Sequence, residues 1–62
     1  MTKKVKQVCD LLEENGFEFV RIRGDHRIYR KDKVGIVVIP GNLGDDLATG
    51  TFNSILRKAG LK

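Results

Sequence analysis

The sequence predicts an α+β fold in which two helices cover one face of a three-stranded antiparallel sheet. Two segments, one near each end of the chain, carry apolar residues at helical spacing. Three short segments between them are rich in β-branched and aromatic residues and are separated by turn-like sequences. Two amphipathic helices on one sheet give a two-layer sandwich of order α-β-β-β-α, and we expect the other sheet face to be open to solvent.

Residues 2–16 are expected to form the first helix. Their apolar side chains recur at i, i+3, i+4 and i+7, and Leu11 widens the resulting stripe. Thr2 is a candidate N-cap, and Gly16 is a candidate for the glycine that follows the last turn. The stripe consists of Val5, Val8, Cys9 and Leu12. The single cysteine therefore reads as a small core residue.

The three predicted strands are residues 17–23, 26–31 and 34–40. The dipeptide Gly24–Asp25 separates the first two, and glycine at the first central position suits a two-residue type II′ turn. The third strand has a nearly continuous apolar run, which predicts that it is the best buried of the three. Residues 41–50 contain three glycines and two acids and are expected to form a loop.

The first predicted strand changes phase along its length. Phe17 and Phe19 share one parity. Val20 and Ile22 follow on the other parity. Either a β-bulge or partial burial on both faces would explain this change.

Residues 51–61 are expected to form the second helix. Thr49 or Thr51 is a candidate cap for its start. Gly60 followed by Leu61 matches a Schellman ending. The apolar stripe repeats the spacing of the first helix and consists of Phe52, Ile55, Leu56 and Ala59.

Length and composition limit what the protein can do. We expect one domain over residues 1–62, too small to enclose a deep cofactor cleft, so any chemistry would take place on an open surface with a large substrate. We see neither a membrane-spanning run nor a signal peptide, and the lone Cys9 suits a reducing cytoplasm. One cysteine and one histidine cannot build a zinc site, and we expect no metal or other cofactor.

The positive charge is concentrated in one segment. The net charge is +4, and residues 21–33, with six basic and two acidic residues, account for all of it. Such a concentration is typical of proteins that bind polyanions such as nucleic acid, although a merely solvated face would look the same. The candidate phosphate-binding side chains are Arg21, Arg23, Arg27, Arg30 and Lys31.

The only histidine, His26, lies inside this basic segment. Across a turn formed by Gly24 and Asp25, Arg23 and His26 would be directly paired, so their side chains would leave the same sheet face. Arg21, two residues earlier on the strand, would share that face. The neighbouring cations disfavour the imidazolium form and the Asp25 carboxylate favours it, and the balance depends on distances that the sequence does not give.

Three motifs together resemble the HicA toxin family, small ribonucleases of bacterial toxin–antitoxin pairs. They are LLEENGF at the end of the first helix, RIRGDH across the first hairpin, and GTFNSILRKAGL in the last helix. The element order also has the outline of a double-stranded-RNA-binding domain. The resemblance implies that His26 is the catalytic residue, that the substrate is messenger RNA, and that a HicB-type antitoxin neutralises the protein by binding it. Two positions depart from the family pattern: Asp25 stands where serine is usual, and Asn42 stands near a place where many members carry histidine.

The function expected from this resemblance is a metal-independent endoribonuclease. Neutral His26 would take the proton of the ribose 2′-OH, and Arg21, Arg23 or Arg27 would stabilise the phosphoryl oxygens. Water, Tyr29 or a lysine would protonate the leaving oxygen. The alternatives are a non-catalytic RNA-binding module of the double-stranded-RNA-binding type and an adaptor whose basic face meets an acidic protein.

Overall fold

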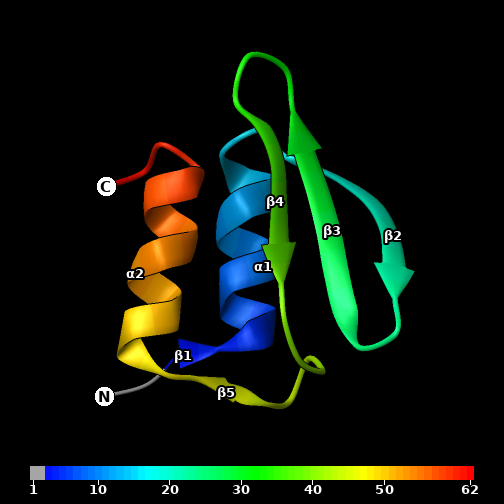
Figure 1. Ribbon diagram of the computed structural model, residues 1–62, viewed down its shortest axis with the longest axis vertical. Helices are drawn as coiled ribbons and strands as arrows, with labels where there is room; N and C mark the ends of the chain where they lie inside the picture. Colours follow the sequence, from blue (N-terminus) through cyan, green and yellow to red (C-terminus); the bar gives the residue numbers. More distant parts are fainter. Residues whose placement is uncertain (1–2) are drawn as a thin grey trace.

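The computed structural model describes residues 3–62 and has the predicted two-layer architecture (Figure 1). Helices α1 (Val5–Glu14) and α2 (Thr49–Lys58) form one layer. The other layer is an antiparallel sheet in which β3 (His26–Lys31) lies between β2 (Glu18–Arg23) and β4 (Gly35–Ile39). The molecule measures 30 × 26 × 16 Å. The α+β fold class is therefore confirmed.

The segment predicted as a loop contains a short strand that the sequence did not reveal. Strand β5 (Asp46–Leu47) pairs antiparallel with β1 (Lys3–Lys4), and the Lys4 ammonium lies 2.9 Å from the Asp46 carboxylate. Leu47 is buried, so this small second sheet ties the start of α1 to the start of α2. Two residues are too few to show an alternating pattern, and their pairing partners lie more than forty positions apart in the sequence.

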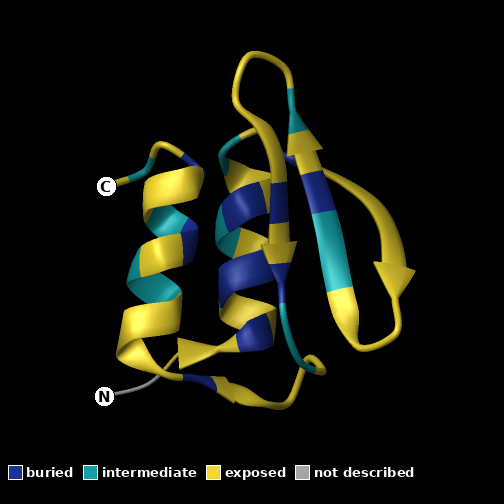
Figure 2. Ribbon diagram, viewed as in Figure 1, coloured by how far each residue is buried: buried dark blue, intermediate teal, exposed yellow. Residues whose placement is uncertain are grey.

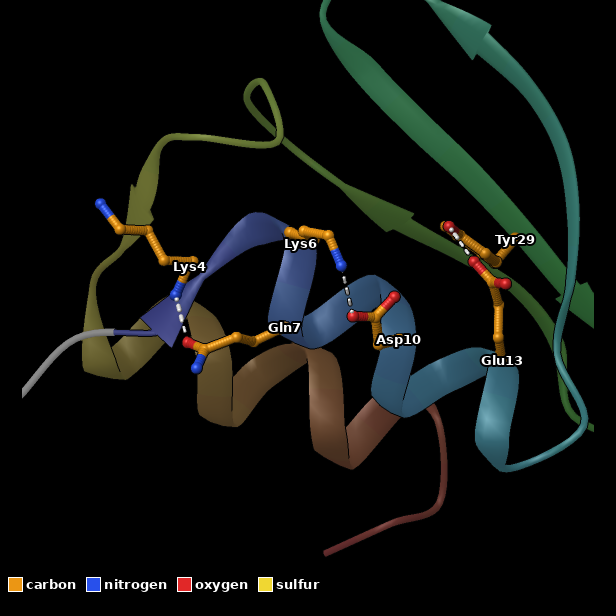
Figure 3. Close-up of polar contacts among 6 residues, drawn as sticks. All are labelled: Lys4, Lys6, Gln7, Asp10, Glu13 and Tyr29. Atoms are coloured by element: carbon orange, nitrogen blue, oxygen red, sulfur yellow. Dashed lines mark hydrogen bonds and ion pairs between the residues drawn. The ribbon is translucent and has the colours of Figure 1, made fainter.

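Helix α1 buries the stripe that its sequence predicts. Val5, Val8, Cys9 and Leu12 are all at most 3% exposed. The helix begins at Val5, where the Lys4 N–H donates to Gln7 Oε1 at 3.0 Å (Figure 3). This contact satisfies one of the backbone donors that a helix start leaves unpaired. Thr2, the candidate N-cap, lies outside the described residues.

The end of α1 is a Schellman motif. The Gly16 N–H donates to Glu13 O at 3.2 Å, and the Phe17 N–H donates to Leu12 O at 3.0 Å. Gly16 has φ +90°, in a region that side chains with a Cβ rarely adopt. This residue turns the chain from the helix directly into β2.

Replacing Gly16 with alanine is expected to destabilise the protein by about 1 kcal/mol, because alanine is strained at positive φ. A Cβ at this position would also lie 3.4 Å from the Lys31 side chain. Gly50→Ala is the matched control, because Gly50 lies inside α2 with open space around its Cα. The control is expected to be neutral or slightly stabilising, since alanine is the better helix former. Urea unfolding of both variants checks the sign, and equal effects would contradict the assignment.

Helix α2 begins earlier than predicted. Its first residue is Thr49, and Ala48 occupies the N-cap position without a side-chain capping bond. The prediction that Thr49 or Thr51 caps the helix was therefore wrong. Strand β5 ends at Leu47, so the helix starts almost directly after it.

The Schellman ending predicted for the second helix is confirmed at the end of α2. The Gly60 N–H donates to Arg57 O at 3.1 Å, and the Leu61 N–H donates to Leu56 O at 2.9 Å. The apolar stripe also faces inward: Ile55 and Ala59 are buried, and Phe52 and Leu56 are half-buried.

One face of the sheet contributes to the core and the other is open. Tyr29, Val37 and Ile39 are at most 3% exposed and belong to one buried cluster with the α1 stripe. Ile36 and Val38 alternate with them on β4 and are 62% and 41% exposed. Strand β4 has more buried residues than β3 or β2, as predicted, but its other three residues are exposed, and β3 has only two exposed residues. No residue of β2 is buried (Figure 2). Figure 1 shows why: β2 is the edge strand farthest from α2.

Candidate active site

The first hairpin places His26 at the start of β3. His26 pairs directly with Arg23 across the turn formed by Gly24 and Asp25. Gly24 has φ +64°, whereas Asp25 is not among the residues with positive φ. A positive φ at the first central residue alone is what the predicted type II′ turn requires. The His26 side chain is 50% exposed, so the imidazole is open to solvent and to a large substrate.

A β-bulge in β2 decides which residues share the face of His26. The pairing register shifts between Phe19 and Arg21, so the bulge predicted from the phase change is confirmed. Before the bulge, Phe19 pairs with the buried Tyr29, and their rings meet edge to face at 5.7 Å. After it, Arg21 pairs with Ile28 and Arg23 with His26, so both arginines lie on the open face. A regular strand would have put them on the face of Phe19 instead.

The other predicted basic residues of β3 divide between the two faces. Arg30 alternates with the buried Tyr29 and so lies on the open face, where its guanidinium is 3.4 Å from the Asp32 carboxylate. Lys31 lies on the helix side: its ammonium donates to Asn15 O at 2.7 Å and stands 5.6 Å from the centre of the Phe17 ring. The structure thus gives Lys31 a role in joining the sheet to the end of α1.

Arg27 also lies away from His26. It pairs with Ile22 and with the buried Ile39, so it belongs to the helix side of the sheet. Its Nε is buried, and no group within residues 3–62 accepts a hydrogen bond from it. The fold therefore brings together Arg21, Arg23, His26 and Arg30, which we call the basic face, and separates Arg27 and Lys31 from it.

The Asp25 carboxylate touches the histidine directly. Asp25 Oδ1 lies 2.8 Å from His26 Nδ1, and both side chains are at least half exposed. The sequence placed these residues next to each other but left their distance open. In the structure the close ionic neighbour of the imidazole is this carboxylate.

Tyr29 is a core residue and not part of the basic face. Its hydroxyl donates to Glu13 Oε2 at 3.0 Å on the helix side of the sheet (Figure 3). Of the three groups considered for protonating the leaving oxygen, Tyr29 is therefore excluded, and water or a lysine is left. The reason is the pleat: Tyr29 lies an odd number of residues from His26 on one strand, so the two side chains leave opposite faces.

The folded protein is expected to keep Tyr29 protonated well above its ordinary titration range. Burial, together with the neighbouring Cys9 and Glu13, raises the pKa of the Tyr29 phenol. The unfolded chain loses this proton near pH 10, so above that pH the folded state binds more protons and stability falls as pH rises. Tyrosinate absorbance during an alkaline titration reports the loss of the Tyr29 proton directly, because the chain has one tyrosine and no tryptophan. Urea unfolding at several pH values gives the accompanying loss of stability. Tyr29→Phe should weaken the alkaline loss of stability, and an unchanged loss would contradict this origin.

The basic face is an open surface. Neither of the two hollows, of about 280 and 300 Å³, includes His26: the first is lined mainly by α1 and Phe52, and the second by Gly16, Glu18 and residues 30–32, so that only Arg30 of the basic face borders one. Within residues 3–62, no three His, Cys, Asp or Glu side chains are grouped to hold a metal ion. Neither helix of the described chain has the length and apolar content that crossing a membrane requires.

Comparison with protein families places the chain in a class of toxins. The family model that matches is described as HicA toxin of bacterial toxin-antitoxin, and it matches residues 5–61. Because this match spans nearly the whole chain, the protein belongs to the HicA toxin family, as its motifs suggested. It is thus a toxin of a toxin–antitoxin system, and its partner is an antitoxin. A search of curated proteins found no match.

Proposed function

We propose that this toxin is a metal-independent endoribonuclease that cleaves messenger RNA in the cytoplasm, with His26 as its general base. The observation that carries the proposal is the position of the only histidine: it stands exposed on the open sheet face, paired with Arg23 and on the same side as Arg21 and Arg30. An RNA strand lying on this face would bring its phosphates to the guanidinium groups and its ribose hydroxyls to the imidazole.

The proposed reaction needs one proton acceptor and a cationic surface. Neutral His26 removes the proton of the 2′-OH, whose oxygen bonds to the adjacent phosphorus. Arg21 and Arg23 stabilise the charge that develops on the phosphoryl oxygens. The bond from phosphorus to the 5′-oxygen breaks, and that oxygen takes a proton from water or a nearby lysine. The products are a 2′,3′-cyclic phosphate and a 5′-OH.

The same face is the proposed contact for a HicB-type antitoxin. A protein that brings carboxylates to Arg21, Arg23 and Arg30 would neutralise the charge that RNA requires and would cover His26. Binding of RNA and of the antitoxin is then mutually exclusive. A stable ternary complex with intact RNA on the basic face would contradict this part of the proposal.

Expression in growing bacteria tests the proposal. Wild type and His26→Ala are induced side by side, and total RNA is isolated from both cultures. Growth arrest with fragmented messenger RNA in the wild type alone supports the nuclease. Binding of RNA without strand breaks by the purified wild type would instead favour a non-catalytic RNA-binding module, which also uses a basic surface but needs no histidine.

A further inference from the structure

We infer that Asp25 is a positioning residue that holds His26 in the tautomer with its hydrogen on Nδ1, which leaves Nε2 as the proton acceptor. The inference rests on the proposed function for its role in cleavage. The tautomer itself follows from the contact between the two side chains and can be measured without RNA.

The contact fixes which nitrogen carries the hydrogen. Asp25 Oδ1 and His26 Nδ1 are 2.8 Å apart, a short hydrogen-bond distance. An ionised carboxylate has only acceptors, so the ring nitrogen must donate. A neutral imidazole with its hydrogen on Nδ1 has its free lone pair on Nε2. The atom left free is therefore the one that points away from Asp25 and can receive a proton from a ribose hydroxyl.

Among the described residues, the Asp25 carboxylate is paired with His26 and not with one of the neighbouring arginines. Arg23 and Arg21 lie on the face of His26 from β2, and Arg30 lies on it from β3. Among the ion pairs of the described residues, Arg30 is joined to Asp32, whereas Asp25 is joined to His26. The turn explains this choice, because Asp25 directly precedes His26 at the tip of the hairpin and reaches the ring without any long-range packing.

The pair is exposed, and this limits the size of its effect. The side chains of His26 and Asp25 are 50% and 65% exposed, so water competes for both. Replacing a buried carboxylate that orients a catalytic histidine lowers kcat by about 10⁴-fold, and for the exposed Asp25 we expect a fall of about tenfold. The same negative charge repels RNA phosphates, so its removal is expected to lower kcat and KM together, a pattern that simple loss of structure does not produce.

The test compares wild type with Asp25→Ala and with Asp32→Ala. Asp32 is the matched control, because it is an exposed aspartate of the same basic segment and its loss changes the net charge equally. A long-range proton–nitrogen correlation spectrum, recorded where the ring is neutral, reports the tautomer. The chain has one histidine, so the signals need no assignment. Single-turnover and steady-state cleavage of labelled RNA gives kcat and KM.

We expect the Nδ1–H tautomer to dominate in wild type and in Asp32→Ala, and the population to move toward Nε2–H in Asp25→Ala. We expect kcat to fall about tenfold in Asp25→Ala alone. The same tautomer in all three proteins, or an equal fall in kcat for both variants, would overturn the inference. If the tautomer shifts as expected but no protein cuts RNA, the proposed function fails and the Asp25–His26 pairing stands. If His26-dependent cleavage persists without a tautomer shift, the function stands and the role of Asp25 fails.

Discussion

Replacing His26 with alanine is expected to lower the rate of RNA cleavage by about 10²- to 10⁴-fold, which is the usual contribution of one general base. No second histidine can take over the proton, because the chain has only one. The loss should appear in kcat, since Arg21, Arg23 and Arg30 remain on the basic face to hold RNA. Cleavage of end-labelled RNA under single-turnover conditions measures the change.

The fold should survive this substitution. The His26 side chain is half exposed, and changes at exposed positions usually shift stability by no more than about 0.5 kcal/mol. Thr51→Ala is a suitable control, because Thr51 is an exposed residue of α2, on the helix layer. The control should cleave RNA at the wild-type rate. Full activity in His26→Ala, with an unchanged circular dichroism spectrum, would remove His26 from the mechanism.

Replacing Leu12 with alanine is expected to produce the largest loss of stability. Leu12 is fully buried and is among the largest side chains of the core. Such a truncation removes apolar burial and leaves a cavity, at a cost of about 2–5 kcal/mol. A 62-residue domain has a total stability of only about 3–9 kcal/mol, so the variant should be partly or wholly unfolded at 37 °C.

Leu43→Ala is the matched control for the core. The substitution is chemically the same, but the Leu43 side chain is 43% exposed and lies in the segment between β4 and β5. We expect a loss below about 0.5 kcal/mol. Urea unfolding followed by circular dichroism gives both values. Comparable losses for the two leucines would show that the α1 stripe is not the centre of the core.

The elements that could be predicted from the sequence are those with a local signal. The apolar stripe of α1 repeats over three turns. Gly16 ends α1 and Gly60 ends α2, each with the backbone hydrogen bonds of a Schellman motif. The phase change before Arg21 revealed the bulge, because a strand has a period of two residues and an inserted residue reverses it. The same period placed Arg21 and Arg23 with His26.

The features that the sequence did not show depend on contacts between distant segments. The pairing of β1 with β5 joins segments more than forty positions apart, and the N-cap of α2 is Ala48, which precedes both candidate threonine caps. Charge alone grouped Arg27 and Lys31 with the basic face, although the pleat turns them toward the helices. The predicted strand over residues 26–31 already separates them, because Arg27 and Lys31 lie an odd number of residues from His26. The hydrogen bond between Asp25 and His26 depends on side-chain rotamers, which no sequence pattern gives.

The chemistry of the cleaved ends tests most directly whether His26 acts as the general base. Wild type is incubated with end-labelled RNA, and in parallel with the same sequence carrying 2′-O-methyl groups, both in an excess of metal chelator. If His26 is the general base, the unmodified RNA is cleaved to 2′,3′-cyclic phosphate and 5′-OH ends, and the methylated RNA is not cleaved. Cleavage that stops in chelator, or that cuts the methylated RNA equally well, would contradict the role given to His26 on its exposed, arginine-lined face.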